Sequence, residues 1–413
     1  MVKRASGNVL YTNDNLYVLS GMNSATVDLI YLDPPFNTKR MFSAPIGSKA
    51  AGASFKDMWT WQDVDEYHLD TLADQFPALA KYIASVGAIH SKPMMAYLTY
   101  MAQRIVEMHR ILKETGSLYL HCDPTASHYL KNLLDSIFGK NNFRNEIVWA
   151  YHRWTSASTA FQRTHDIILF YAKNKNLIEF NVQSEPYSKQ SKHKAKRFTK
   201  IESGKLIQNY TEDSVREKSM RDVWEISILN SMSKERTGYP TQKPLALLKR
   251  IILASSNDGD VVMDPFCGCA TTCVAAQQLD RKWIGIDLET NVVNILIERL
   301  TNKGAFFKDF IATDKIPKRS DVTEVQPKEE SVRERLYREQ DGTCKGCGVK
   351  MELRHLETDH IIPSTKGGGD YYENYQLLCA NCNRIKGARP MEFLRMKIEK
   401  REQMMKTQII FGE

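Results

Sequence analysis

Four residues near the start of the chain have side chains and carbonyl groups suited to chemistry on an amine. Asp33, Pro34, Pro35 and Phe36 directly follow the apolar run 27–32. If that run is a parallel strand, Asp33 lies at its C-terminal end, where α/β folds bind their ligands. A carboxylate and a proline carbonyl accept hydrogens from a ring-conjugated amine and so prepare it for in-line attack, while Phe36 offers a face for stacking. The alternative is a plain tight turn, because Asp-Pro pairs are common in turns.

A second candidate ligand site is the small-residue turn 264–272, between an expected strand and an expected helix. Small side chains let the backbone approach a ligand closely. Asp287 closes the following strand about twenty residues on, the position from which dinucleotide folds bind ribose hydroxyls. The turn alone is a weak signal, and the downstream acid strengthens it.

Two Cys-x-x-Cys pairs lie near the end of the chain, Cys344 with Cys347 and Cys379 with Cys382. A tetrahedral zinc ion needs four ligands, and each pair offers two thiolates. A single pair arises by chance or serves redox chemistry, but two pairs within about forty residues predict a structural zinc. A module this small could hardly fold without one. The unpaired cysteines are expected to be small buried residues: Cys122, Cys267, Cys269 and Cys273.

Alternating strands and helices must position the N-terminal candidates. Short apolar runs at 27–31, 117–121 and 166–171 predict strands, and residues 94–112 have helical spacing. A further strand–helix–strand unit spans 260–287. This pattern predicts a mostly parallel sheet with helices on both faces.

Three segments depart from that pattern. Residues 41–93 predict a partly helical insertion, and residues 175–237 are polar and charged, with a net +5 within 185–221. Residues 313–330 are too poor in apolar side chains to bury much and predict a linker.

The composition allows two or three domains but excludes global disorder, because 42% of the 413 residues are hydrophobic. The net charge of +8 weakly favours a polyanionic partner. No signal peptide and no run of about 20 apolar residues is evident, so a cytoplasmic protein is expected.

The N-terminal motifs, taken together, resemble those of SAM-dependent DNA amino-methyltransferases. Asp33 to Phe36 resembles the catalytic motif and 266–268 the SAM motif, in the order of the permuted β group; 13–16, 116–123 and 238–244 match as well. The resemblance implies a Rossmann-like methyltransferase fold over residues 8–300, with Asp33, Pro34, Pro35 and Phe36 at the target base. It also implies a SAM pocket lined by Asp14, Thr241, Gln242, Lys243, Asp264, Phe266, Gly268, Thr271 and Asp287.

One departure from this family lies in the SAM motif. Ala270 stands where the family has its second glycine, so the turn must avoid positive φ there or carry strain. By analogy, Asp33 favours N6-adenine as the target, because serine is frequent at this position in N4-cytosine enzymes; cytosine remains the alternative.

The resemblance further implies a target-recognition element in residues 175–237. Its basic residues are expected to contact DNA phosphates, against the alternative of a solvated loop. The candidate DNA-binding residues are Lys192, Lys194, Lys196, Arg197 and Lys200.

The residues between the cysteine pairs resemble the HNH nuclease motif, a small zinc-bound ββα-metal fold. By this resemblance, Asp359 and Asn383 bind Mg²⁺ or Mn²⁺, and His360 is the general base that activates water. Asn374 would hold the His360 loop in position. Helices are expected at 332–340, before the module, and at 390–406, after it.

The sequence therefore predicts a methyltransferase domain at 1–312, a linker at 313–330 and an HNH module at 331–413. The expected function is site-specific N6-adenine methylation of double-stranded DNA, with an HNH module that cuts or nicks DNA in restriction–modification or defence. The alternatives are an HNH module that only binds DNA, and an RNA or protein methyltransferase. A homodimer is an open expectation, because β-group enzymes often dimerise.

Overall fold

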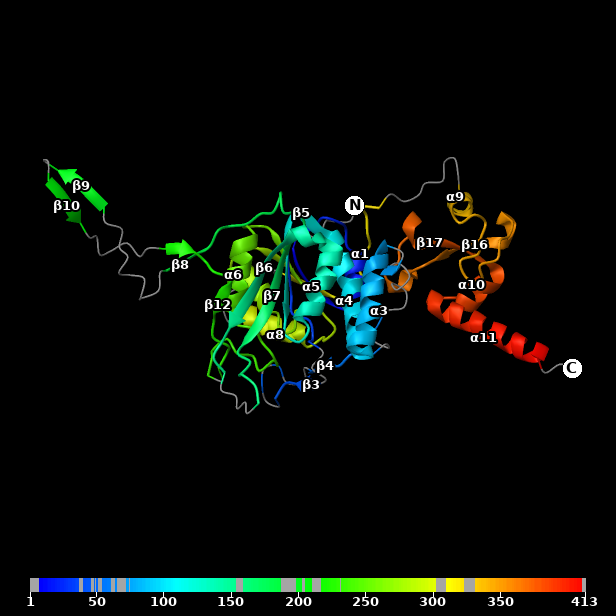
Figure 1. Ribbon diagram of the computed structural model, residues 1–413, viewed down its shortest axis with the longest axis horizontal. Helices are drawn as coiled ribbons and strands as arrows, with labels where there is room; N and C mark the ends of the chain where they lie inside the picture. Colours follow the sequence, from blue (N-terminus) through cyan, green and yellow to red (C-terminus); the bar gives the residue numbers. More distant parts are fainter. Residues whose placement is uncertain are drawn as a thin grey trace.

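The computed structural model of the chain describes residues 7–36, 40–45, 48, 50, 54–60, 64, 72–73, 75–153, 159–186, 198–202, 205–209, 217–230, 232–301, 310–322 and 331–410. Within these residues the chain forms a large α/β domain and a small C-terminal module (Figure 1). No helix among them is long and apolar enough to cross a membrane.

A nine-stranded sheet forms the centre of the large domain. Its order is β12 (Val223–Glu225), β6 (Phe143–Ala150), β7 (His165–Ala172), β5 (Leu112–Cys122), β2 (Val27–Leu32), β13 (Val261–Asp264), β14 (Lys282–Asp287), β1 (Asn8–Thr12) and β15 (Phe310–Thr313). Strand β7 runs antiparallel to both of its neighbours, and the remaining pairings are parallel. The mostly parallel sheet expected from the sequence is confirmed.

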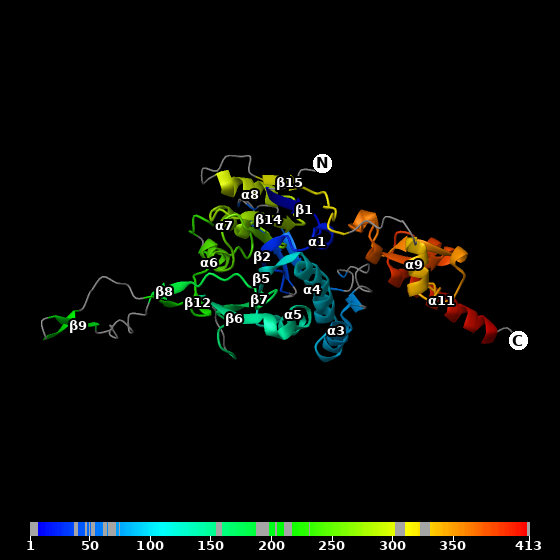
Figure 2. The ribbon, with the colours of Figure 1, turned by 90° about the horizontal axis from the view of Figure 1, so that it is seen from above.

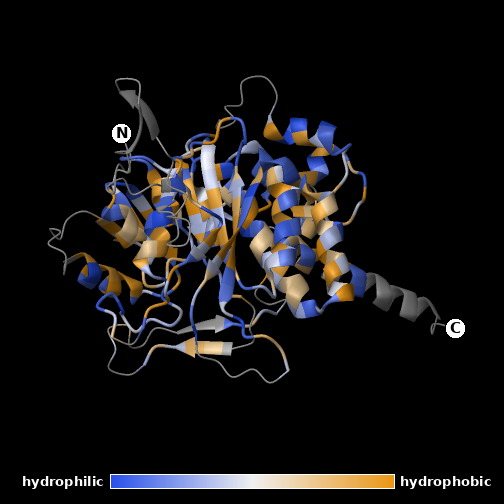
Figure 3. Ribbon diagram, turned by 60° about the vertical axis from the view of Figure 1, so that its left-hand side comes forward, coloured by the Kyte–Doolittle hydropathy of each residue, from blue (hydrophilic) through white to orange (hydrophobic). Residues whose placement is uncertain are grey.

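Helices cover both faces of this sheet (Figure 2). One face carries α1 (Asn15–Gly21), α3 (Pro77–Ile89), α4 (Lys92–Ile111) and α5 (Ser127–Leu134), which continues into a π-helical turn (Asp135–Gly139) and a 3-10 turn (Lys140–Asn142). The other carries α6 (Leu245–Ser255), α7 (Thr271–Gln277) and α8 (Val292–Thr301). Many of the helices carry both hydrophobic and hydrophilic residues, as helices with one buried side do (Figure 3).

The central strand β2 is buried on both sides, which explains its mostly apolar sequence; its one charged residue, Asp28, is paired with Lys113. Ile30 and Leu32 pack into the core below α1 and α4, while Leu29 and Tyr31 pack into the core below α6 and α7. Successive side chains of a strand point to opposite faces, so a strand covered on both faces is apolar at most positions. The turn that follows β2 is therefore held on a rigid support.

The helix expected at 94–112 is α4, and its ends have clear causes. The Ser91 hydroxyl accepts a hydrogen bond from the Met94 backbone N–H, and Pro93 occupies the first turn, where no N–H is needed. The helix ends at Ile111, and β5 begins at the next residue.

The segments that break the α/β pattern contain antiparallel pairs. The expected partly helical insertion at 41–93 begins with the strand pair β3 (Arg40–Ser43) and β4 (Ser54–Asp57), before α3. In the polar region 175–237, β8 (Ser184–Pro186) pairs with β11 (Glu217–Ser219), and β9 (Phe198–Glu202) pairs with β10 (Lys205–Asn209). The same region supplies the sheet strand β12, with Trp224 buried, so its last part belongs to the central domain.

The C-terminal module is a two-stranded sheet surrounded by helices. It comprises α9 (Val332–Glu339), β16 (Leu356–His360), β17 (Tyr375–Cys379), α10 (Ala380–Lys386), α11 (Met391–Ile410) and the 3-10 turns Leu353–His355, Ser364–Lys366 and Tyr372–Asn374. Helix α9 starts at a capping box of Ser331 and Glu334. Its small core includes Leu336, Leu356 and Leu377 with the cysteine side chains.

Part of the expected linker is bound to the large domain. Thr313 is the last residue of β15. The Asp314 carbonyl accepts a hydrogen bond from the Asn13 side chain, and the Ser320 N–H donates one to the Asn23 side chain. Beyond it, the C-terminal module lies beside α1, with Lys366 Nζ 4.8 Å from the centre of the Tyr17 ring.

Candidate active site and metal centre

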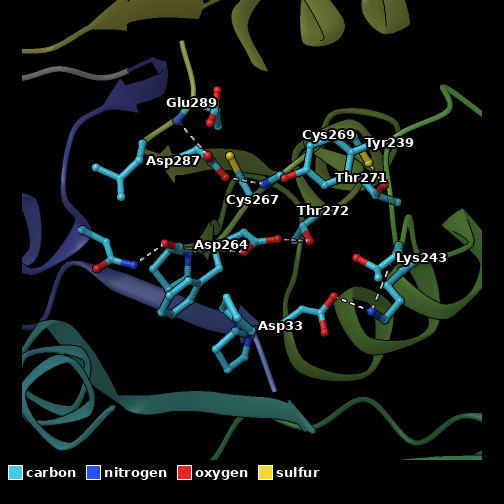
Figure 4. A pocket seen from close by; sticks show the side chains of 18 of the residues that line it. Asp33, Tyr239, Lys243, Asp264, Cys267, Cys269, Thr271, Thr272, Asp287 and Glu289 are labelled. Carbon is cyan, nitrogen blue, oxygen red and sulfur yellow. Dashed lines mark hydrogen bonds and ion pairs between the residues drawn. The ribbon is translucent and has the colours of Figure 1, made fainter. Parts of the chain in front are cut away.

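A cavity of about 580 Å³ opens at the C-terminal ends of β2, β13 and β14. It is lined by the turns after these strands, the start of α1 and the loop before α6 (Figure 4). All the methyltransferase site residues singled out in the sequence line it: Asp14, Asp33, Pro34, Pro35, Phe36, Thr241, Gln242, Lys243, Asp264, Phe266, Gly268, Thr271 and Asp287. Its volume is in the range of sites for drug-sized ligands.

The catalytic candidate Asp33 forms an ion pair with Lys243. Lys243 Nζ donates to Asp33 Oδ2 at 2.5 Å, and both side chains are largely buried. Lys243 was expected among the cofactor residues, but its ammonium lies on the carboxylate of the catalytic turn and 5.6 Å from the centre of the Phe36 ring. The pair compensates two charges in a partly apolar wall and fixes the direction of the Asp33 side chain.

Two further carboxylates hold the small-residue turn 264–272, called the glycine turn below. Asp264, the last residue of β13, accepts hydrogen bonds from Thr272 Oγ1 at 2.5 Å and from the Phe266 N–H at 3.1 Å. Asp287, the last residue of β14, accepts from the Gly268 N–H at 2.7 Å and the Glu289 N–H at 3.0 Å. Burial raises the pKa of Asp264 to about 7 and also raises the pKa of Asp287. The turn is thus tied to both strand ends.

The turn needs residues with positive φ at two positions. Gly268 has φ 50°, and a Cβ there would lie 3.0 Å from the ring of Tyr239. Ala270 has φ 58° and ψ 35°, so the second position is also left-handed, although the residue is not glycine. The strain considered for Ala270 is therefore present.

A buried arginine connects the start of α1 to α4. Arg104, on the apolar side of α4 and only 2% exposed, donates to Asp14 Oδ1 at 2.9 Å and to Asn15 Oδ1 at 2.6 Å. Asn15 in turn donates to the carbonyl of Pro265 in the glycine turn. The sequence analysis missed Arg104 and Asn15; the signal for Arg104 was a charged residue among the apolar positions of a helix.

The loop before α6 is held by its own side chains. Gln242 Oε1 accepts from the backbone and hydroxyl of Thr237, and its amide donates to the Glu235 carbonyl. Thr241 has φ 60° and its hydroxyl donates to the Pro240 carbonyl. Gln242 thus uses its polar atoms to shape the loop that presents Lys243.

The four paired cysteines form a cluster in the C-terminal module. The sulfurs of Cys344, Cys347, Cys379 and Cys382 all lie within 4.8 Å of one another. Four thiolates at this spacing suit the tetrahedral coordination of zinc. The cysteines Cys122, Cys267, Cys269 and Cys273 are buried in the large domain.

The HNH residues lie on the β16–β17 sheet and α10. Asp359 Oδ2 accepts from Lys386 Nζ and Gln376 Nε2, both at 2.9 Å. His360 Nε2 lies 2.8 Å from Asp370 Oδ1, and Asn383 donates to Glu357 Oε2 at 2.7 Å.

The loop after His360 is closed by Asn374. Its amide oxygen accepts from the Ile362 N–H, and its amide nitrogen donates to the carbonyls of Ile362 and Gly369. These three bonds join Asn374 to the two ends of the segment 362–369, which follows His360.

Of the five candidate DNA-binding residues, only Lys200 falls within the described part of the chain. Lys192, Lys194, Lys196 and Arg197 lie outside the described residues, and Lys200 is in β9.

Comparison with known proteins identifies both parts of the chain. Residues 27–298 match the family model described as DNA methylase, with N6 and N4 methyltransferases as its members, and residues 344–389 match that of the HNH endonucleases. The Type II methyltransferase M.HpaI of Haemophilus parainfluenzae is 30% identical over 225 residues, 54% of this chain and 64% of that protein, less than two thirds of its length. The DNA adenine methyltransferase YhdJ of Escherichia coli K12 is 26% identical over 321 residues, 76% of this chain and 92% of that protein. Among solved structures, the M1.HpyAVI–SAM complex covers 71% of this chain and 98% of its own at 18% identity, with a TM-score of 0.38.

The strained turn predicts the effect of restoring the glycine. Replacing a left-handed alanine by glycine relieves about 1–2 kcal/mol of strain. Glycine also makes the unfolded chain more flexible, which destabilises the folded state by about 0.5–1 kcal/mol. Ala270→Gly is therefore expected to stabilise the protein by up to about 1 kcal/mol. Thermal unfolding measures this as a higher Tm. Ala275→Gly, inside α7, is the matched control and should lower the Tm. A lower Tm for Ala270→Gly as well would contradict the assigned backbone conformation.

The cysteine cluster predicts one zinc per chain, measured by elemental analysis of the purified protein. Cys382→Ser is expected to lose the metal and to unfold the C-terminal module, because zinc binding contributes folding free energy there. Cys122→Ser, a buried cysteine outside the cluster, should keep the zinc. A zinc-free wild-type protein with a folded module would rule out the structural metal.

Proposed function

The chain belongs to the DNA methylase family, and we propose that it transfers a methyl group from SAM to the N6 amino group of adenine in double-stranded DNA. The observation that carries this proposal is the Asp33–Lys243 ion pair beside Phe36, at one end of a cavity whose other end is bounded by Asp287. A base amine and a methyl donor can meet only where such an acceptor faces a ligand-sized space.

The residues at the reacting end would orient the amine. Asp33 Oδ2 accepts from Lys243, which leaves Oδ1 to accept a hydrogen of the amine and direct its lone pair toward the methyl group. The side chain of Phe36 would stack on the extruded base. When bound, SAM supplies a methyl group on an electrophilic sulfonium.

The residues at the other end would hold the cofactor. Asp287, at the end of β14, is placed to accept ribose hydroxyls, and the turn 264–272 brings backbone close to the ligand. Asp14 at the start of α1 is held toward the same cavity by Arg104. Tyr239, packed against Gly268, limits the width of the cavity at the turn.

Adenine rather than cytosine is the proposed target. The family includes both N6 and N4 enzymes, and aspartate at position 33 is the residue that, by resemblance, accompanies adenine. N4-methylcytosine in the product would make cytosine the target without changing the roles of Asp33 and Lys243.

For the HNH domain we propose DNA cleavage with His360 as general base. Asp359 and Asn383 would hold Mg²⁺ or Mn²⁺ through oxygen, and Asn374 would keep the His360 loop in place. The contacts of Asn374 with Ile362 and Gly369 support this assignment, because general-base catalysis requires a fixed imidazole.

The second candidate is an HNH domain that binds DNA without cutting. The ion pair between Lys386, 1% exposed, and Asp359 favours it, because a built-in ammonium already compensates the carboxylate that a metal ion would use. Cleavage would then require Lys386 to give way to the metal.

The wider setting follows from these activities. We assign methylation to residues 1–312, with target recognition in 175–237, and cleavage to residues 331–413. Residues 313–330 would link the two domains. The Type II methyltransferases among the relatives support a restriction–modification or defence role. A cytoplasmic location and homodimerisation are part of the same proposal.

The methylation proposal predicts the behaviour of Asp33→Asn. Because the amide is neutral and a weaker acceptor, methyl incorporation into unmethylated DNA from labelled SAM should fall by about 10²–10⁴-fold. The affinity for SAM, measured by calorimetry, should stay within a few-fold.

The matched control for Asp33→Asn is Lys113→Met. This variant breaks the pair of Lys113 with Asp28, another aspartate–lysine pair of the same sheet, outside the cavity lining. It should methylate like the wild type. Undiminished methylation by Asp33→Asn would remove Asp33 from the reaction.

The cleavage proposal predicts that His360→Ala loses DNA cutting in the presence of Mg²⁺, with zinc content unchanged. Gel analysis of plasmid DNA measures nicks and breaks. His355→Ala changes an exposed histidine of the same module and should still cut. If the wild type itself makes no breaks, the domain is a binding arm.

A further inference from the structure

A polar network lies beneath the catalytic turn, in the otherwise apolar core of the sheet. His121, on β5, is completely buried, and both of its ring nitrogens have partners. Nδ1 lies 2.9 Å from the Tyr31 hydroxyl on β2, and Nε2 lies 3.1 Å from Asp166 Oδ2 on β7. Burying polar groups costs free energy unless every group is hydrogen-bonded. Apolar side chains would fill this part of the core without that cost, so the network indicates a role other than packing.

The network leads from the cavity toward the protein surface. His121 Nδ1 lies 3.8 Å from Asp33 Oδ1, the oxygen that Lys243 does not use. At the far end, the Asp166 side chain is 17% exposed and accepts from the Tyr151 hydroxyl at 3.2 Å.

The groups around His121 decide which of its ring nitrogens donates and which accepts a hydrogen bond. Burial opposes ionisation of Asp166, but the hydrogen bonds from His121 and Tyr151 and the positive charge of Lys243 lower the pKa of this carboxyl. An ionised Asp166 accepts the Nε2 proton and leaves Nδ1 as the acceptor on the Asp33 side. The other titratable groups next to this network are Tyr31, Cys122, Asp123, Glu146, Tyr151 and Lys243.

The methylation step has a proton to dispose of. The amine carries two hydrogens before the reaction and one afterwards, because a new N–C bond forms as the S–C bond of the donor breaks. The nitrogen must therefore release one proton inside a cavity closed by DNA. Lys243 is a poor acceptor, since its ammonium is already bound to Asp33 Oδ2.

We propose that His121 and Asp166 form the exit route for this proton, with Asp33 as the first acceptor. Asp33 Oδ1 takes the proton from the methylated nitrogen. It passes this proton to His121 Nδ1 once the Tyr31 hydroxyl turns away from that nitrogen and the Asp33 side chain closes the 3.8 Å separation. His121 releases its Nε2 proton to Asp166, which gives it to water at the surface. His121 acts through Asp33 and is a positioning residue for proton transfer; this inference rests on the proposed methylation.

A purely structural role for His121 would also require its hydrogen bonds, so the test must separate that role from proton transfer. The ring packs against Phe36, with centres 5.8 Å apart, and edge-on against Trp149 at 5.5 Å. A change of shape at position 121 therefore disturbs the base-stacking side chain. An external base can replace a lost proton acceptor, but it cannot repair lost packing.

The experiment measures single-turnover methylation of DNA by the full-length protein with saturating SAM. His121→Gln keeps hydrogen-bonding groups but cannot carry a proton, and its rate at pH 7 should fall by about 10²-fold. The rate of the variant should rise with pH more steeply than that of the wild type. Asp166→Asn should show a smaller loss with the same pH trend. The affinity for SAM should be unchanged in both.

A second variant tests the route by chemical rescue. His121→Ala leaves a ring-sized space, and added imidazole should restore methylation in proportion to its free-base concentration. Pyrrole, a ring of the same size without a basic nitrogen, can refill the space but should not restore methylation. His109→Gln changes a half-buried histidine, on α4 and outside the cavity lining, and should show no response to imidazole.

Two outcomes would overturn the relay. One is a wild-type rate in His121→Gln; the other is a loss that neither pH nor imidazole reduces, which would mean that His121 only supports Phe36. Absence of methylation by the wild type would instead contradict the proposed function itself.

Discussion

The ion pair between Asp33 and Lys243 joins the two segments of the large domain that form the reacting end of the cavity. Its partners are 210 residues apart in sequence and come from the turn after β2 and the loop before α6. A partly buried carboxylate and a partly buried ammonium are stable only together, so each fixes the other. The pair forms because β2 is locked between two cores, and because Gln242 holds the loop that carries Lys243.

The same principle organises the remaining walls of the cavity. Parallel strands end at one edge of the sheet, and the carboxylates of Asp264 and Asp287 stand at two of these ends. Both accept backbone N–H groups of the glycine turn, so the turn has its shape before any ligand binds. Arg104 performs the equivalent task for the start of α1. Preorganised polar groups of this kind need no rearrangement when charge develops in a reaction.

The sequence predicted the elements better than the contacts between them. The apolar runs at β2, β13 and β14, and the helical spacing of α4, depend on local periodicity, which residues carry in their own order. The reversed direction of β7, and the place of β12 in the main sheet, depend on pairing between distant strands. The same limit applies to side chains: Lys243 lines the cavity as expected, but its pairing with Asp33 could not be predicted from spacing. His121 sits in a strand that reads as apolar, and only the three-dimensional network reveals its partners.

The central claim is that one cavity brings a methyl donor and an amine together at Asp33. A crystal structure of the full chain with SAM tests it most directly. The account predicts that the adenosine lies toward Asp287 and the glycine turn, with the sulfonium methyl directed at the space beside Asp33 and Phe36. SAM bound in the reverse orientation, or outside this cavity, would contradict it.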